Sequence, residues 1–250
     1  MHKENSSPPD ALPKDISGLA VFLDIDGTLL DIAETPDSVI VPPGVTAALA
    51  RMSDRLDGAL ALVTGRSIDM VDRLFQGMAL PVSGLHGAEW RDDRGRVMHA
   101  TTPAFERAKC RLRRQAASWP GAVFEDKGAA FALHYRLAPR REPHIRGLMA
   151  ELAEAVGTDW VLQDGKDVVE LRPRGRDKGD ALMAFMELDA FCGRRPLTIG
   201  DDVTDEAMFA AANRLGGLSV RVGKDGRSSL AKRLVASPSD VRAWIERITT

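Results

Sequence analysis

The chain has 250 residues, of which 44% are hydrophobic and 28% are charged, a composition typical of a globular protein. Its formal net charge of -2 gives no electrostatic basis for binding nucleic acid or an anionic membrane surface. No apolar run approaches the roughly 18 residues that a membrane-spanning helix needs. The two cysteines, Cys110 and Cys192, have neither a metal-ligand spacing nor a CxxC arrangement, which favours free thiols in a reducing compartment.

The first 18 residues carry Pro8, Pro9 and Pro13 together with several charges. They lack the apolar stretch of a secretory signal peptide. This composition is typical of a flexible lead-in, so we expect residues 1–18 to be flexible and the protein to be cytoplasmic.

Apolar runs alternate with amphipathic stretches over the next part of the chain. The expected elements, in chain order, are a strand over 19–25, a helix over 45–56, a strand over 59–63, a helix from its Ser67 cap to about residue 75, and a short strand over 80–83. Strands that alternate with helices indicate βαβ units, and almost continuously apolar strands fit a buried parallel sheet.

The pattern then changes to closely spaced strands. The expected elements are a hairpin over 88–99 that turns at 92–95, a helix over 103–119, strands over 123–125 and 131–136, a helix over 142–156, and strands over 160–163 and 168–171. Asp164-Gly165, between the last two strands, is a strong signal for a type I′ hairpin turn. This order predicts a small α+β module with an antiparallel sheet.

After Pro173 the alternation of helix and strand returns. The expected elements are a helix over 178–188, a strand over 196–199, a helix capped by Thr204, a strand over 218–222, and a last helix that opens at Ser237. We therefore predict a parallel-sheet domain, formed by 19–90 and 174–250, that is interrupted by an antiparallel insert over 91–173.

Two carboxylates follow the first predicted strand, in the run Asp24-Ile25-Asp26-Gly27-Thr28. Ligand sites in open parallel sheets lie beyond the carboxyl ends of the strands. The two acids repel each other unless a cation sits between them or one binds a proton. The alternative is a polar loop that has no catalytic or binding role. That alternative would be favoured if a single Asp followed the strand, but it explains the whole Asp-x-Asp-Gly-Thr run poorly.

A second acidic cluster, Asp201, Asp202, Asp205 and Glu206, follows the apolar strand over 196–199. Four acids within six residues form a natural site for a hard cation. Favourable interaction with a helix dipole could explain Glu206 on its own. It does not explain the two acids that precede the helix, so we favour a metal site.

Thr64 and Lys178 are weaker signals when each is taken alone. Thr64 ends a predicted strand and precedes Gly65-Arg66, but threonine is common at strand ends. Lys178 opens a helix, where a cation is slightly unfavourable against the helix dipole, and this placement indicates an anionic ligand nearby.

In this order and placement, the four features resemble the motifs of the haloacid dehalogenase superfamily of phosphohydrolases. The matching positions are 24–28, Thr64, Lys178 and 200–205. The resemblance implies an α/β fold: a Rossmann-like parallel-sheet core with helices on both faces, plus an inserted smaller α+β cap domain. The predicted insert lies between the second and third motifs, where the superfamily has one of its known caps.

The resemblance also implies a role for each residue. Asp24 would be the nucleophile, and Asp26 would be the acid for the leaving sugar oxygen and then the base for water. Mg²⁺ would be held by the Asp24 carboxylate, the Asp26 backbone carbonyl and Asp201. Thr64 and Lys178 would hold the phosphoryl oxygens.

The resemblance implies supporting roles for two further acids. Asp202 and Asp205 would lie in the second shell of the metal, where Asp205 would orient either a metal-bound water or Lys178.

The segments around the insert resemble those of trehalose-6-phosphate phosphatases. The matching features are Thr-Gly-Arg at 64–66, a Gly-x-His-Gly-Ala-Glu run over 84–89, and paired Glu and Lys residues in the insert. By that resemblance, the sugar hydroxyls would be bound by four residues: Glu125, Lys127, Lys166 and Glu170. Arg66 and His86 would lie near the phosphate or its sugar.

The alternative for the insert residues is a set of surface ion pairs across strands. We interpret His134 as structural, because it lies in an alternating strand, and leave Glu89 without a role. The function that we expect is hydrolysis of trehalose 6-phosphate to trehalose and phosphate through an aspartyl-phosphate, by a monomer that binds a small-molecule sugar phosphate.

Three other readings remain open. The enzyme could be a phosphatase or a mutase for another sugar phosphate, such as sucrose 6-phosphate. It could be a phospho-Asp signalling module, although Asp26 has an obvious role only where an alcohol leaves. It could also be an inactive binding protein, which the four intact motifs disfavour.

Overall fold

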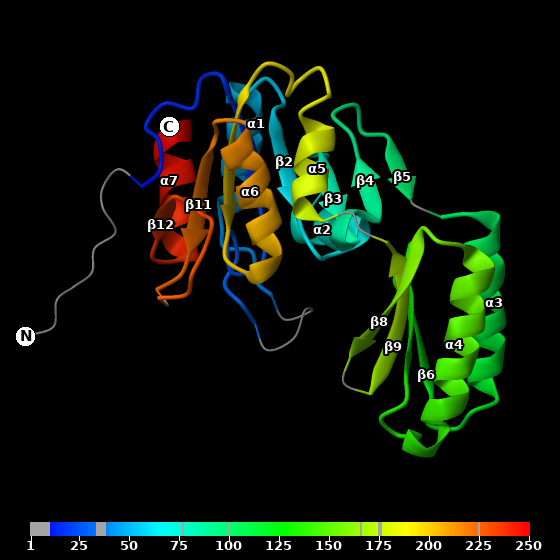
Figure 1. Cartoon of the computed structure of the whole chain (residues 1–250). Coiled ribbons are helices and arrows are strands. Elements are labelled where there is room, and N and C mark those ends of the chain that lie inside the picture. Colours follow the sequence, from blue (N-terminus) through cyan, green and yellow to red (C-terminus); the bar gives the residue numbers. More distant parts are fainter. Residues whose placement is uncertain are drawn as a thin grey trace, which may run out of the picture. The chain divides into compact units, whose positions relative to one another are not determined.

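The computed structural model describes residues 11–33, 39–76, 78–99, 101–165, 167–174, 177–224 and 226–250, without the side chains of residues 86, 98 and 99. The chain forms two compact units, Met1–Val97 with Asp177–Thr250, and Met98–Arg176 (Figure 1). The second unit is thus an insertion in the first. Among the described residues, none of the helices is both long and apolar enough to cross a membrane.

The first unit is built on an eight-stranded sheet in the order β12-β11-β10-β1-β2-β3-β4-β5. Its strands are β1 (Leu19–Leu23), β2 (Leu60–Val63), β3 (Val82–Gly84), β4 (Glu89–Arg91), β5 (Val97–His99), β10 (Arg195–Gly200), β11 (Leu218–Val222) and β12 (Arg233–Val235). The neighbouring pairs from β12 to β3 are parallel, and β3 pairs with β4 antiparallel. All five residues of β1 are buried, as its continuous apolar run predicts.

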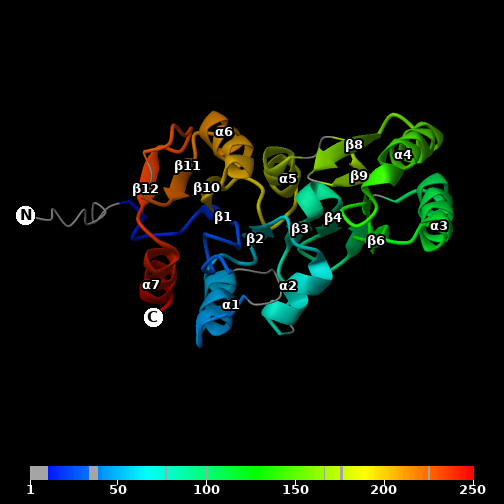
Figure 2. The same cartoon turned by 90° about the horizontal axis from the view of Figure 1, so that it is seen from below.

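Helices cover both faces of this sheet. They are α1 (Val45–Arg55), α2 (Ile68–Leu74), α5 (Lys178–Phe185), α6 (Glu206–Arg214) and α7 (Pro238–Thr249), with 3-10 turns η2 (Leu85–Gly87) and η4 (Val203–Asp205). Figure 2 shows α1, α2 and α7 on one face and α5 and α6 on the other. Phe22 of β1 packs against the rings of Phe185 and Phe191, with centroids 6.0 and 5.6 Å away, so the core continues from the sheet into the α5 layer.

The second unit has a four-stranded antiparallel sheet in the order β6-β7-β9-β8. Its elements are α3 (Pro103–Ala117), β6 (Val123–Asp126), β7 (Phe131–His134), η3 (Pro139–Arg141), α4 (Glu142–Val156), β8 (Trp160–Gly165) and β9 (Val168–Pro173). Both helices bury their apolar sides against Phe131, Leu133 and Leu171 of the sheet. Because side chains alternate along a strand, the residues between these point to the opposite face. The predicted fold class is confirmed.

The boundaries of the insert differ from the expected 91 and 173. The chain divides between 97 and 98 and between 176 and 177. The reason is the hairpin after β3: its strand β4 pairs with β3 in the large sheet, and the division falls within β5, the last strand of that sheet.

The prediction of a flexible lead-in is wrong for residues 11–18. Ala11, Leu12 and Ile16 are buried in the core of the first unit. The indole N–H of Trp244 donates a hydrogen bond to the carbonyl of Pro13 at 2.7 Å, which ties this segment to α7. A few apolar side chains are enough to dock the segment, although it forms no helix or strand. Residues 1–10 lie outside the described residues.

Two local predictions need correction. Gly165 pairs with Val168, so the connection between β8 and β9 lies after Gly165 and not at Asp164-Gly165. Thr204 does not cap a helix, because it lies within η4, which opens with a reciprocal capping box between Asp202 and Asp205. Asp202, two residues before Thr204, takes the capping position, and its N–H donates to Oδ2 of Asp205 at 2.9 Å.

Candidate functional site

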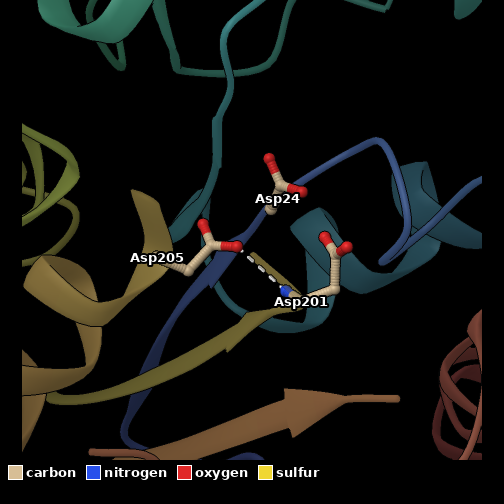
Figure 3. Close-up of side chains that lie close together, drawn as sticks. All are labelled: Asp24, Asp201 and Asp205. Carbon is tan, nitrogen blue, oxygen red and sulfur yellow. Dashed lines mark hydrogen bonds between the residues drawn. The ribbon is translucent and has the colours of Figure 1, made fainter. Parts of the chain in front are cut away.

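Two acidic motifs meet at the carboxyl edge of the large sheet. β1 and β10 are neighbouring parallel strands with Leu23 opposite Ile199, and the N–H of Asp24 donates to the Ile199 carbonyl at 3.0 Å. Carboxylate oxygens of Asp24, Asp201 and Asp205 consequently lie within 4.8 Å of one another (Figure 3). Two of these acids, Asp24 and Asp201, belong to the predicted metal set; the third is Asp205, which we expected in the second shell, and not Asp26.

Lys178 joins two of these acids. Its Nζ donates to Oδ1 of Asp24 at 2.7 Å and to Oδ1 of Asp205 at 2.6 Å, and all three side chains are buried. Lys178 starts α5, which a capping box between Asp177 and Asp180 begins. Burial lowers the pKa of Lys178, but the attraction of Asp24 and Asp205 outweighs it, so the pKa is raised and the side chain is charged.

The Asp205 carboxylate binds two backbone N–H groups of its own motif and the ammonium of Lys178. Its Oδ2 accepts the backbone N–H groups of Asp201 and Asp202, both at 2.9 Å, while Oδ1 accepts from Lys178. A Cβ on Gly200 would lie 2.3 Å from Cγ of Asp205, so only glycine leaves room for this carboxylate. With both oxygens engaged, Asp205 is suited to positioning its neighbours.

The charges around Asp24 favour a divalent cation. With all three carboxylates ionised, the one ammonium of Lys178 would leave two negative charges uncompensated, which a divalent cation can balance. Burial, followed by the charges of Asp205 and Asp201, raises the pKa of Asp24 to about 8, although Lys178 acts in the opposite direction. A Mg²⁺ ion supplies two positive charges and prefers carboxylate oxygens, so these donors fit it.

The motif loop leaves space beside Asp201. Gly27 has a φ of +79°, and a Cβ there would lie 2.2 Å from Oδ2 of Asp201. The hydroxyl of Thr28 donates to Oδ1 of Asp201 at 3.3 Å. Glycine and threonine in the first motif therefore let the two acidic loops approach each other closely.

Thr64 and Arg66 lie at the end of β2, next to β1. The buried Thr64 Oγ1 accepts the backbone N–H of Arg66 at 3.1 Å. The Arg66 guanidinium donates two hydrogen bonds to the Asp26 carboxylate, Nε to Oδ2 and Nη2 to Oδ1, both at 2.6 Å. The Asp26 side chain is 38% exposed, so it stands at the open side of the site while Asp24 lies buried behind it.

Two predicted site residues of the first unit remain, Asp202 and His86. Asp202 is exposed, with an oxygen 3.7 Å from Nη1 of Arg227. The side chain of His86 lies outside the described part of the structure.

In the second unit, three predicted sugar ligands form one cluster. Lys127 Nζ lies 2.6 Å from Glu170 Oε2 and 3.8 Å from Glu125 Oε2. Glu125 and Glu170 lie on neighbours of the central strand β7, opposite Ala132 on either side, and so share a face of the sheet. That face is opposite to the one that α3 and α4 cover. Lys166 lies outside the described residues.

Two residues without an assigned ligand role also contact these sites. His134 Nε2 lies 2.8 Å from Glu125 Oε2, so His134 shares the charged face of β7. Arg227 donates to the carbonyl of Asp201 at 3.0 Å. The alternation of β7 could have indicated His134, whereas Arg227 follows β11, and no local pattern links it to β10.

Comparison with known proteins agrees with this geometry. The family model described as trehalose-phosphatase matches residues 22–239. A probable trehalose-phosphate phosphatase of Sinorhizobium fredii (strain NBRC 101917 / NGR234) is 53% identical over 236 residues, 94% of this chain and 89% of that protein. The trehalose-6-phosphate phosphatase of Escherichia coli (strain K12) is 43% identical over 233 residues, 92% of this chain and 86% of that protein.

A solved structure extends the agreement to the fold. A trehalose-6-phosphate phosphatase related protein is 27% identical, with a TM-score of 0.66, and the match covers 92% of this chain and 96% of that one. The match of the family model spans both acidic motifs, Thr64, Lys178 and the whole inserted unit. The chain therefore belongs to the trehalose-phosphatase family.

Proposed function

We propose that this chain is a Mg²⁺-dependent phosphatase that hydrolyses trehalose 6-phosphate to trehalose and phosphate, with Asp24 as the nucleophile. The observation that carries the proposal is the convergence of Asp24, Asp201, Asp205 and Lys178 at one edge of the sheet. Membership of the trehalose-phosphatase family supports the substrate.

In the first step, an oxygen of Asp24 attacks the phosphorus atom, and the bond from phosphorus to the sugar oxygen breaks. The carboxylates of Asp24 and Asp201 and the backbone carbonyl of Asp26 would hold Mg²⁺, which would supply positive charge against the phosphate dianion. Lys178 and the Thr64 hydroxyl bind the phosphoryl oxygens and stabilise the charge of the transition state.

Asp26 acts first as the general acid and then as the general base. It donates a proton to the departing sugar oxygen, and then takes one from the water that hydrolyses the aspartyl-phosphate and releases phosphate. Both Asp26 oxygens accept from Arg66 in the structure. A protonated oxygen donates instead, so we expect at least one of these two hydrogen bonds to break when the ester binds.

We propose that the charged face of the second unit recognises the sugar. Carboxylates and ammonium groups form several strong hydrogen bonds with hydroxyls. Glu125, Lys127 and Glu170 already pair with one another, and their shared face supports a common ligand. Lys166 would complete the set by the family resemblance.

The decisive experiment measures phosphate release from trehalose 6-phosphate, sucrose 6-phosphate and glucose 6-phosphate side by side, with Mg²⁺ and with a chelator. We expect rapid release from trehalose 6-phosphate, slower release from the other two, and no release without a divalent ion. Preference for another ester would overturn the substrate, and full activity with chelator would overturn the metal.

A further inference from the structure

The segment over 84–89, from the end of β3 to the start of β4, contacts the backbone that follows Thr64. The N–H of Leu85 donates to the carbonyl of Arg66 at 3.1 Å. The Oε2 of Glu89 accepts the N–H of Ile68 at 2.7 Å. The carbonyl of Arg66 and the N–H of Ile68 are thus both held by one short segment, which the sequence marks but the mechanism does not use.

The fit between the two segments is close. A Cβ on Gly84 would lie 2.7 Å from the carbonyl oxygen of Arg66 and 3.4 Å from the nitrogen of Ile68. Leu85 has a φ of +45°, in the left-handed region that residues other than glycine rarely adopt. Both features indicate that the position of residues 66–68 against β3 is tightly determined.

Glu89 is a firm anchor because it is buried. Its exposed fraction is 5%, and a buried carboxylate is costly unless hydrogen bonds satisfy it. Ser67 Oγ accepts the N–H of Met70 at 3.3 Å, so the first turn of α2 is capped by Ser67 from its own segment and by Glu89 from β4. Replacing Glu89 removes the acceptor for the Ile68 N–H without touching the Ser67 cap.

A second charged residue of β4, Arg91, binds α2 at a later position, Asp72. The buried Arg91 donates from Nη1 to both carboxylate oxygens of Asp72, at 2.8 and 3.0 Å, and from Nε to the carbonyl of Leu80 at 2.7 Å. Glu89 and Arg91 are two residues apart on one strand, and therefore on one face of it. Asp72 thus offers a contact on the same helix, but one remote from residues 66–68.

Arg66, the first residue of the 66–68 backbone, contacts two groups that the proposed reaction needs: the Thr64 hydroxyl and the Asp26 carboxylate. The N–H of Arg66 donates to Thr64 Oγ1, which leaves the hydroxyl hydrogen free to point to a phosphoryl oxygen. The Arg66 side chain holds Asp26 through two hydrogen bonds. A shift of this backbone would move Thr64 and Asp26 together.

We propose that Glu89 is a positioning residue of the active site, which holds the N–H of Ile68 and thereby sets Arg66 against Asp26 and Thr64. The proposal rests on the proposed function, since it assigns how that site is aligned. It adds a role for the acid of the Gly-x-His-Gly-Ala-Glu run that is independent of any contact with substrate.

The test compares Glu89→Ala and Glu89→Gln with the control Asp72→Asn. We expect Glu89→Ala to lower kcat by about 10- to 100-fold with little change in KM, because alignment changes while the sugar contacts remain. Glu89→Gln keeps an acceptor oxygen and should recover most of the activity. Asp72→Asn should leave kcat unchanged. Combined with Arg66→Lys, Glu89→Ala should add little, since both act on one chain of contacts.

A second readout does not depend on activity. Hydrogen exchange of the peptide that contains residues 66–68 should be faster in Glu89→Ala than in the wild type, and unchanged in Asp72→Asn. Unchanged exchange, an equal loss of kcat in the control, or full additivity with Arg66→Lys would overturn the role of Glu89. A wild-type protein that releases no phosphate would overturn the proposed function instead, while the exchange comparison would still decide whether Glu89 fixes this backbone.

Discussion

Lys178 shares one ammonium group between two buried carboxylates, at 2.7 Å from Asp24 and 2.6 Å from Asp205. In an ion triad of this kind, removal of the ammonium leaves two buried carboxylates without their cation, whereas removal of one carboxylate leaves Lys178 paired with the other. Lys178 also fixes Oδ1 of Asp24 and leaves Oδ2 without this contact. If Asp24 is the nucleophile, as we propose, the contacts that hold the folded site together also orient the attacking oxygen.

At this scale, Asp24→Asn is expected to abolish turnover. An amide oxygen is a far weaker nucleophile than a carboxylate, so the covalent route is lost and kcat should fall by about 10⁴-fold or more. Phosphate release from trehalose 6-phosphate is the measurement, and a near-wild-type circular dichroism spectrum is the control for folding. A rate close to that of the wild type would remove Asp24 from the role of nucleophile.

The direction of the strands and the alternation of their side chains explain why the candidate functional residues lie close together. β1, β2 and β10 are parallel neighbours, so the loops after them meet at one edge of the sheet. In the second unit, strand alternation separates an apolar face under α3 and α4 from a charged face with Glu125 and Glu170. Each site is thus the direct result of strand direction or strand period.

The charged face predicts a selective effect of Glu170→Ala. We expect KM to rise by about tenfold or more for trehalose 6-phosphate and to change little for a small aryl phosphate, because only the disaccharide offers hydroxyls to this face. Glu151→Ala is the matched control: Glu151 lies in α4 of the same unit and pairs with Arg111 of α3. Equal losses on both substrates would contradict a role in binding the sugar.

The elements that the sequence predicts best are those with strong local patterns. The apolar runs that become β1 and β10 and the Ser67 cap of α2 are found where expected. β12 is not predicted, because this edge strand has three residues and two of them are exposed. The run over 84–89 marks Glu89 by resemblance, but no local pattern reveals its contact with Ile68, which is 21 residues away and meets it only in the folded sheet.

For the molecule as a whole, the buried acids link stability to pH and metal. In the absence of a metal, the pKa of Asp24 is raised from 3.8 to about 8, mainly by burial. Between these values the folded state binds more protons than the unfolded state, so this group makes stability fall as pH rises. A divalent ion competes with the proton, which makes Mg²⁺ more stabilising at higher pH.

Thermal unfolding checks this linkage. The rise in Tm on addition of Mg²⁺ should be larger at pH 8 than at pH 6, and the dependence on pH should weaken in Asp24→Asn. Na⁺ at equal ionic strength is the control for general salt effects. An equal rise in Tm at both values of pH would show that the metal does not displace a proton from this site.

The adjacency of β1 and β10 has a consequence for synthesis of the protein. The strand β1, which leads to the proposed nucleophile Asp24, is made early, whereas its partner strand β10 starts at Arg195, after the whole second unit. A ribosome-bound chain halted before Arg195 would leave one edge of β1 without its neighbour, and exposed strand edges invite aggregation. Nascent chains should therefore depend on chaperones until β10 has emerged, and neither Mg²⁺ nor substrate could protect them earlier.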